Sequence, residues 1–144
     1  MSTNTINFSQ LFLRLALAAS LLSAVADRLG IWGPPGATNV SWGDWKHFLA
    51  YSNTLNFYVS PQTGNILAIL ATVLEVVFGV MFLIGYKTRL AAWGTFLLMV
   101  IFALSMTVAM GVKPPLSYSV WTTAGAAALL GSINKYKWSI DNLK

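Results

Sequence analysis

The 144-residue chain has no cysteine, only four acidic residues and a single histidine. The absence of cysteine excludes disulfide bonds, thiolate metal sites, covalent haem attachment and a redox dithiol. One histidine and four carboxylates are too few for us to expect a metal site built by this chain. We therefore expect no intrinsic cofactor, so any electron transfer here depends on a bound cofactor, such as a quinone, or on a partner protein.

Charge is also scarce, because Asp, Glu, Lys and Arg make up 9% of the chain while hydrophobic residues make up 56%. Soluble domains carry about a quarter charged residues, so this composition excludes an ordinary soluble globule and predicts a lipid bilayer as the surrounding solvent. The formal net charge is +5. The cations are scattered and no recognition motif accompanies them, so we expect no nucleic-acid partner.

Four long apolar runs predict four membrane-spanning helices, since a helix needs about 20 apolar residues to cross the hydrocarbon layer. The first run contains one arginine near its start, the second contains one glutamate, and the third and fourth carry no charge inside the membrane. The predicted fold class is all-α, a membrane four-helix bundle that forms a single domain over residues 1–144. The spans cover residues 8–29, 65–84, 90–110 and 115–132.

The first run also permits a different interpretation as a cleaved signal peptide. Leu15–Leu22 forms a short apolar core, and Ala24-Val25-Ala26 resembles a small-residue cleavage site. No Lys or Arg precedes this core, which favours a retained span.

The long connection between the first two runs, residues 30–63, is rich in amphipathic aromatic residues, which concentrate at membrane–water boundaries. We expect an amphipathic or re-entrant segment here, with a short helix over one end of the bundle. An ordinary surface loop is the alternative, because the apolar residues lack a clean helical period. The aromatic residues are Trp32, Trp42, Trp45, Tyr51, Phe57 and Tyr58.

The distribution of Lys and Arg predicts the orientation of the spans, because short cytoplasmic loops carry an excess of both. Five cations fall on the side of the termini, at Lys87, Arg89, Lys135, Lys137 and Lys144. Three fall on the opposite side, at Arg28, Lys46 and Lys113. We expect a multi-pass protein of the bacterial cytoplasmic (inner) membrane with both termini cytoplasmic and residues 30–63 outside.

Two charges inside the spans, Arg14 and Glu75, are the first candidate site residues. A charge at the centre of a membrane helix costs about 2.5–3.5 kcal/mol and usually has a partner. We predict that Arg14 and Glu75 form a buried ion pair, because a guanidinium can bind a carboxylate at two points. The pair either fixes the packing of two helices or lines a ligand pocket, and both interpretations stay open.

Three more candidates belong to the outer half of the bundle. Asp27 ends the first span, where it either lies free at the interface or joins the outer loop near Lys46 or His47 as one wall of a site. Tyr118 and Trp121 lie in the outer half of the fourth span, where helix packing is the alternative to ligand binding. The candidate ligand-binding set is therefore Arg14, Glu75, Asp27, Tyr118 and Trp121, and no catalytic residue is identified.

The second and third spans resemble the signature of the DoxX family of small four-helix membrane proteins. The shared pattern is Glu75, then Gly79 one turn later, an apolar run to Gly85, and Thr88-Arg89 leading into the third span. The resemblance extends over about residues 8–132 and includes Arg14. The end of the first span departs from the commoner Gly-Lys pattern, because Asp27-Arg28 stands there.

The resemblance implies an association with membrane redox chemistry, since the family takes its name from subunits of a thiosulfate:quinone oxidoreductase and other members belong to oxidative-stress complexes. We expect a component of a membrane redox system that binds a quinone or lipid-like ligand within the bundle. The alternative is a non-catalytic scaffold or assembly subunit with a membrane or periplasmic protein partner. A carrier is disfavoured because the chain has no inverted repeat. Whether the chain is an enzyme stays open.

Overall fold

The computed structural model describes residues 3–143 and contains, within them, six α-helices and no strand. The predicted all-α class is confirmed, with six helices in place of four. The helices are α1 (Thr3–Arg28), α2 (Trp45–Leu55), α3 (Pro61–Ile84), α4 (Thr88–Met110), α5 (Lys113–Ser117) and α6 (Val120–Gly131). A 3-10 turn, η1 (Ile140–Asn142), follows near the C-terminus.

Three of these helices, α1, α3 and α4, are long and apolar enough to cross a membrane. At 1.5 Å per residue, the 24 residues of α3 span about 36 Å, which exceeds the hydrocarbon thickness of about 30 Å. One side of α3 is an almost continuous apolar surface, which fits contact with lipid tails rather than water. Its exposed side chains are Ile66, Leu67, Ile69, Leu70, Val73, Val76, Val77, Val80, Leu83 and Ile84.

The fourth predicted span, residues 115–132, is wrong as a continuous helix. The chain forms the short helix α5 and then the 12-residue α6, separated at Tyr118 and Ser119. Ser119 has φ +56°, a left-handed conformation that cannot continue an α-helix. At about 18 Å, α6 is too short to cross the hydrocarbon layer alone.

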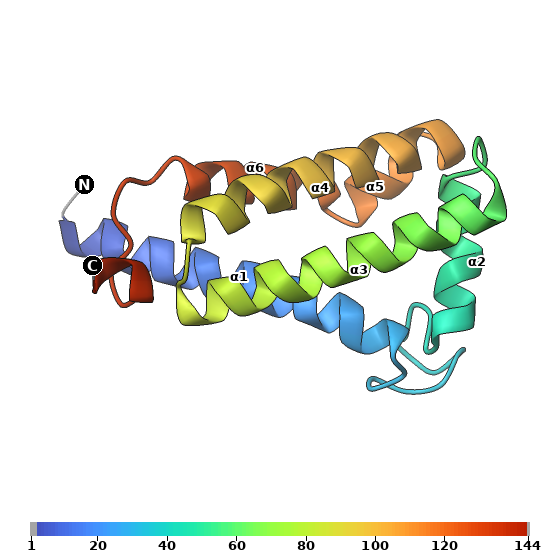
Figure 1. Cartoon of the computed structure of the whole chain (residues 1–144), viewed down its shortest axis with the longest axis horizontal. Coiled ribbons are helices and arrows are strands. Elements are labelled where there is room, and N and C mark those ends of the chain that lie inside the picture. Colours follow the sequence, from blue (N-terminus) through green and yellow to red (C-terminus); the bar gives the residue numbers. More distant parts are fainter. Residues whose placement is uncertain (1–2, 144) are drawn as a thin grey trace.

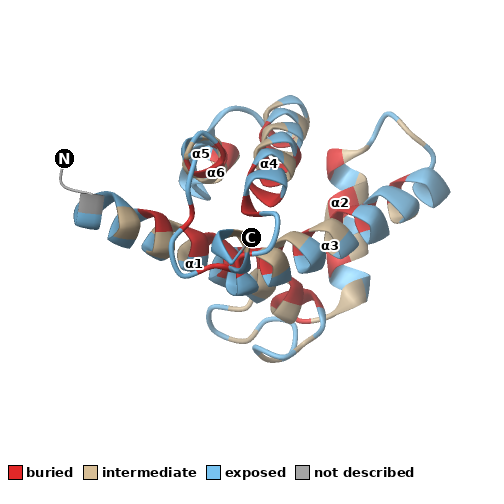
Figure 2. Ribbon diagram, turned by 60° about the vertical axis from the view of Figure 1, so that its left-hand side comes forward, coloured by how far each residue is buried: buried red, intermediate tan, exposed pale blue. Residues whose placement is uncertain are grey.

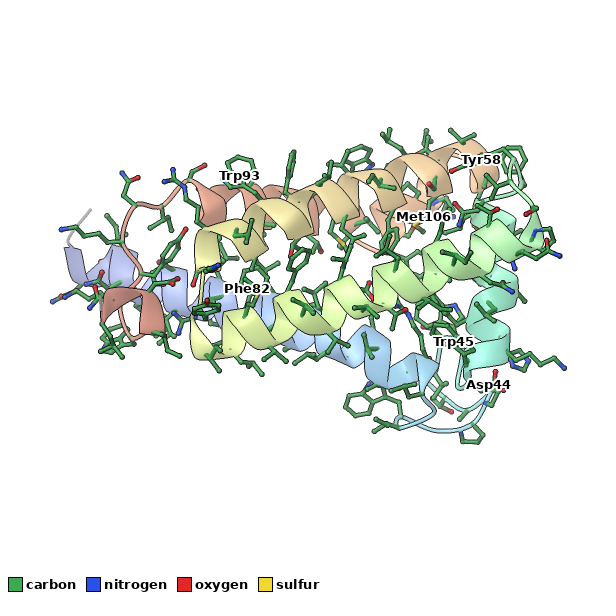
Figure 3. The ribbon with its side chains drawn as sticks, in the orientation of Figure 1. Asp44, Trp45, Tyr58, Phe82, Trp93 and Met106 are labelled. Carbon is green, nitrogen blue, oxygen red and sulfur yellow. The ribbon has the colours of Figure 1, made fainter. Side chains whose placement is uncertain are left out.

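The four longest helices run in alternating directions along the bundle, and α2 crosses one end of it (Figure 1). α1 packs mainly against α3, and α4 mainly against α6. The N-terminal end of α1 and the segment after α6 lie together at the end opposite α2 (Figure 1). Asp44 and Trp45 at the start of α2 therefore lie far from Phe82 and Trp93 (Figure 3).

Small residues line the contacts between the helices, as expected where close packing rather than hydrophobic burial drives association in lipid. Ala18, Ala91 and Ala127 are fully buried. Gly94 illustrates how close the approach is, because a Cβ atom there would lie 2.4 Å from the ring of Phe78. The buried residues face the inside of the bundle and leave the outer helix surfaces exposed (Figure 2).

The predicted short helix within residues 30–63 is present as α2. Its buried face repeats at helical spacing through Phe48, Ser52 and Leu55. Asp44 caps its N-terminus by accepting a hydrogen bond from the backbone N–H of His47, at 2.8 Å. α2 lies across the end of the bundle (Figure 1). A re-entrant course for the segment stays a prediction.

The Asp44 cap predicts a local pH dependence of α2. The hydrogen bond from the His47 N–H lowers the pKa of Asp44 below its ordinary value of about 3.9. The carboxylate therefore stabilises α2 above that value, and this stability is lost as the pH falls through the lowered pKa. Hydrogen-exchange protection of residues 45–55, corrected for intrinsic exchange, should fall as the pH drops below the ordinary pKa of about 3.9 and through the lowered pKa.

Asp44→Asn is the matched control, because asparagine caps helices comparably but does not titrate. The variant should keep its protection over the same pH interval. An equal fall in both proteins would contradict a role for Asp44 ionisation.

Candidate functional site

The buried face of α1 carries polar side chains at both ends and apolar ones between. Gln10, Arg14, Leu17, Leu21 and Arg28 are all buried, and their spacings of three, four and seven place them on one face. Arg14 and Arg28 are 14 residues apart, which is about 21 Å along the helix. α1 thus presents two buried arginines to its neighbours, at two different positions along the helix axis.

Arg28 pairs with Glu75 in the interior of the protein. Its two terminal nitrogens bind both carboxylate oxygens, Nη2 donating to Oε1 at 3.0 Å and Nη1 donating to Oε2. Nη1 also donates to the hydroxyl of Thr72, one turn before Glu75 on α3, at 2.8 Å. Arg28 is 3% exposed and Glu75 is 2% exposed. This two-point geometry is the strongest form of an arginine–carboxylate contact.

Two aromatic rings from the outer segment lie against the same guanidinium. The Cζ atom of Arg28 is 4.0 Å from the ring centroid of Phe48 on α2 and 5.3 Å from that of Trp42 in the preceding loop. Both distances are within the range of a cation–π contact. The charge is therefore enclosed by a carboxylate from α3 and by aromatic rings from the segment between α1 and α3.

Asp27, the neighbour of Arg28, organises the loop that carries Trp42. Its carboxylate accepts hydrogen bonds from the backbone N–H groups of Ser41, Trp42 and Gly43, at 2.8–3.0 Å. Asp27 thus joins the outer loop, as one of its two sequence interpretations predicted. It does so through the loop backbone, and its hydrogen bonds join it to neither Lys46 nor His47.

The predicted pair between Arg14 and Glu75 is wrong. Arg14 lies at the other end of the bundle, where its Nη2 donates to the backbone carbonyl of Trp138 at 2.7 Å. Its Nη1 lies close to Gly85, since a Cβ atom there would be 2.8 Å away. The sequence argument placed Arg28 at the membrane surface, where charge costs little, and so gave Glu75 the wrong partner.

Tyr118 and Trp121 lie at the α5–α6 junction and are on the surface. Tyr118 is 69% exposed and Trp121 is 38% exposed. Of the five sequence candidates, the structure brings Asp27 and Glu75 together around Arg28, whereas Arg14, Tyr118 and Trp121 lie elsewhere. Ligand binding by these five residues stays a prediction.

The sequence interpretation did not select Arg28, Thr72, Trp42 and Phe48 as site residues. A signal for Arg28 was present, because its spacing of two heptads from Arg14 places both on one helix face. Trp42 and Phe48 gave no such signal, since their approach to Arg28 depends on how the outer segment folds. We call Arg28, Glu75, Thr72, Trp42 and Phe48 the arginine centre.

The arginine centre combines a hydrogen-bond donor with two aromatic rings. The Nε–H of Arg28 is buried without a hydrogen-bond partner, so one donor is available. Within residues 3–143, no group of three or more His, Cys, Asp or Glu side chains could hold a metal ion. A donor beside aromatic rings suits a carbonyl or other acceptor on a flat or amphiphilic molecule.

Comparison with known proteins identifies the family. The sequence profile of the DoxX family matches residues 9–108, which is more than half of the chain and includes most of α1, all of α2 and α3, and most of α4. The chain belongs to the DoxX family. Among curated proteins and solved structures, none matches it.

The DoxX signature residues have structural roles on α3 and at the turn into α4. A Cβ atom on Gly79 would lie 2.8 Å from Leu22 of α1, so this position keeps α1 and α3 close. Gly85 ends α3 in a left-handed conformation, with φ +67°. Glu75 of the signature is the acidic half of the arginine centre. Arg28 supplies the basic half, and the adjacent Asp27 anchors the loop.

Proposed function

We propose that this DoxX protein is a component of a membrane redox system that binds a quinone or a lipid-like ligand at the arginine centre. In this proposal it lies in the bacterial cytoplasmic membrane with both termini in the cytoplasm. The cations support that orientation, because the start of α4, which carries Lys87 and Arg89, and the segment after α6, which carries Lys135 and Lys137, lie at the same end of the bundle as the start of α1 (Figure 1).

The observation that carries the proposal is the buried Arg28–Glu75 pair with one unused donor beside two aromatic rings. Ionisable residues inside a membrane domain are expensive and commonly mark ligand or proton paths. The Nε–H of Arg28 can donate to a quinone carbonyl, while Trp42 and Phe48 offer faces for a planar ring. In such a complex the protein supplies binding and orientation, and the bound ligand carries the redox chemistry.

The proposal can be tested by titrating the purified protein in mild detergent with decylubiquinone, a short-tailed quinone, and following tryptophan fluorescence. We expect saturable quenching, since Trp42 lies beside Arg28. Arg28→Lys should weaken binding about tenfold, because an ammonium keeps the charge but loses the planar fork. Native mass spectrometry of the same samples would identify amphiphiles that copurify.

Arg14→Lys is the matched control, since it changes a second buried arginine on the same face of α1. It should alter decylubiquinone affinity less than twofold. Equal effects of the two substitutions, or the absence of saturable binding, would refute a ligand site at the arginine centre. A loss of decylubiquinone affinity in Arg14→Lys alone would instead place the site at the end of the bundle where Arg14 contacts the segment after α6.

A scaffold role is the second candidate, and it rests on the exposed aromatic residues of the outer segment. Trp32, Phe57 and Tyr58 have more than half of their surface exposed, although the Trp32 indole N–H is fixed by hydrogen bonds to Ser23. Such rings suit either a lipid headgroup region or a protein partner. A photo-crosslinker at position 57 that captures one defined protein, while decylubiquinone fails to bind, would favour this role.

A further inference from the structure

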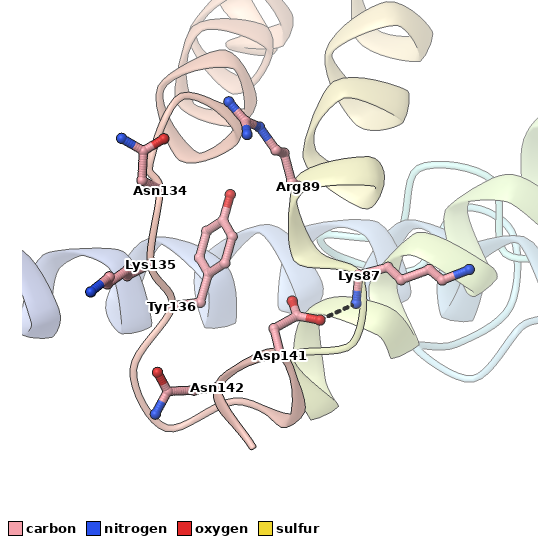
Figure 4. A pocket seen from close by; sticks show the side chains of 7 residues that line it. All are labelled: Lys87, Arg89, Asn134, Lys135, Tyr136, Asp141 and Asn142. Atoms are coloured by element: carbon pink, nitrogen blue, oxygen red, sulfur yellow. Dashed lines mark hydrogen bonds between the residues drawn. The ribbon is translucent and has the colours of Figure 1, made fainter. Parts of the chain in front are cut away.

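A basic cleft opens at the end of the bundle opposite the arginine centre. It has a volume of about 380 Å³ and lies between the start of α4 and the segment that follows α6 (Figure 4). Arg89 on α4 and Lys87, which precedes that helix, line one side, and Asn134 and Lys135 line the other. The cleft therefore combines cations and an amide from two parts of the chain distant in sequence.

The charge of this cleft is not neutralised from within. Lys87, Arg89 and Lys135 contribute three positive charges and Asp141 contributes one negative charge, which leaves two positive charges. Asp141 is already engaged, because its two oxygens accept the backbone N–H groups of Lys87 and Thr88, both at 2.7 Å. In the part of the chain that the structure describes, none of the three cations forms an ion pair.

Tyr136 adds a neutral wall to the cleft. Its hydroxyl donates to the carbonyl of Leu130 at 2.9 Å. Burial raises the pKa of Tyr136, although Arg89 nearby acts in the opposite direction, so the phenol stays protonated near neutral pH. The net positive charge of the cleft is therefore preserved at physiological pH.

An apolar hollow of about 510 Å³ adjoins the basic cleft, and Asn142 lines both. Its walls include Ile84 at the end of α3 together with Trp138, Ile140 and Leu143. All four apolar side chains are exposed. A free anion would use only the basic cleft, whereas an amphiphile with an anionic head would use both surfaces.

We propose that this end of the protein is a binding site for an anionic phospholipid. The phosphate lies near Arg89 and the amide of Asn134, with Lys87 and Lys135 at the two margins of the cleft (Figure 4), and the acyl chains lie against the hollow formed by Ile84, Trp138, Ile140 and Leu143. The site is separate from the arginine centre and does not depend on the function proposed there. It would fix the segment after α6 to the membrane surface through both charge and apolar contact.

The test is native mass spectrometry of the full chain in mild detergent, titrated with phosphatidylglycerol and, separately, with phosphatidylcholine. We expect one saturable phosphatidylglycerol adduct with at least tenfold higher affinity than the phosphatidylcholine adduct. The double substitution Arg89→Gln with Lys135→Gln should weaken phosphatidylglycerol binding about tenfold. The loss of each cation alone should weaken binding by about a factor of five or less. Both positions are exposed, so the fold should persist.

The matched control is Lys46→Gln with Lys113→Gln, which removes the same charge from exposed positions at the other end of the bundle. It should leave the affinity within twofold of that of the parent protein. An equal loss in both double variants would overturn the site and indicate attraction by net charge alone. Inorganic phosphate that displaces the lipid at matched concentration would also overturn it, since a small anion would then suffice.

A third variant keeps the test decisive if the double substitution perturbs folding. Asn142→Asp places a negative charge at the exposed residue shared by the cleft and the hollow. It should weaken phosphatidylglycerol binding severalfold without changing phosphatidylcholine binding. An unchanged phosphatidylglycerol affinity in this variant would contradict the proposed position of the phosphate.

Discussion

Arg28→Ala is expected to lower the free energy of unfolding by about 3–5 kcal/mol, the largest effect of any single substitution considered for this protein. The substitution leaves the Glu75 carboxylate in an apolar interior without the two-point partner that it has now. It also removes the cation against which the Phe48 and Trp42 rings pack. Reversible unfolding in mixed micelles, with increasing fractions of a denaturing detergent, would measure the change.

The double substitution Arg28→Met with Glu75→Leu should recover most of that loss. Replacing a buried ion pair by apolar side chains of similar volume is often neutral or stabilising, because no charge then has to be desolvated. The double-mutant cycle isolates the coupling between the two residues, which we expect to be several kcal/mol. If the double variant is no more stable than Arg28→Ala, that result would contradict this account of the pair.

The double variant also separates architecture from function. If the pair only holds α1 against α3, the double variant should fold and keep every property of the parent protein. If the arginine centre binds a ligand, the double variant should fold but lose decylubiquinone binding, because its donor is gone. Stability alone cannot make this distinction, since both roles predict the same destabilised single variants.

Composition was enough to predict the solvent and the fold class, because so few charges force helices with apolar surfaces into lipid. The boundaries of the second and third predicted spans agree with those of α3 and α4 to within a few residues at each end. The prediction of a continuous fourth span failed for a local reason, since the backbone of Ser119 is in the left-handed conformation between two apolar stretches. An apolar run of sufficient length does not reveal such a break.

The pairing of charges was harder to predict because it depends on the relative height of two helices. Arg14 and Arg28 share one face of α1, so periodicity allows either to meet Glu75. In the structure Gly85, at the end of α3, lies beside Arg14, and Glu75, further toward the middle of α3, lies beside Arg28. α1 and α3 are nearly equal in length, with 26 and 24 residues, but they are offset along the bundle, so Glu75 meets the C-terminal end of α1.

Asp27→Ala is the second substitution with a large expected effect, about 2–4 kcal/mol of lost stability. Each buried N–H left without an acceptor costs about 1–3 kcal/mol, and Asp27 accepts from three, although partial hydration of the loop offsets some of that loss. The effect should extend beyond the loop, because Trp42 is one of the three donors and its ring contacts Arg28. Unfolding in mixed micelles would give the stability, and tryptophan fluorescence would report the altered surroundings of Trp42.

The comparison with Asp44→Ala tests whether burial, rather than capping as such, gives Asp27 its importance. Asp44 also accepts a backbone N–H, but it lies on the surface, where water can replace the lost oxygen. Its removal should destabilise α2 locally and leave the arginine centre intact, so decylubiquinone affinity should change only in Asp27→Ala. Equal effects of the two substitutions on that affinity would mean that Asp27 does not act through the position of Trp42. The role of Asp27 would then concern stability alone.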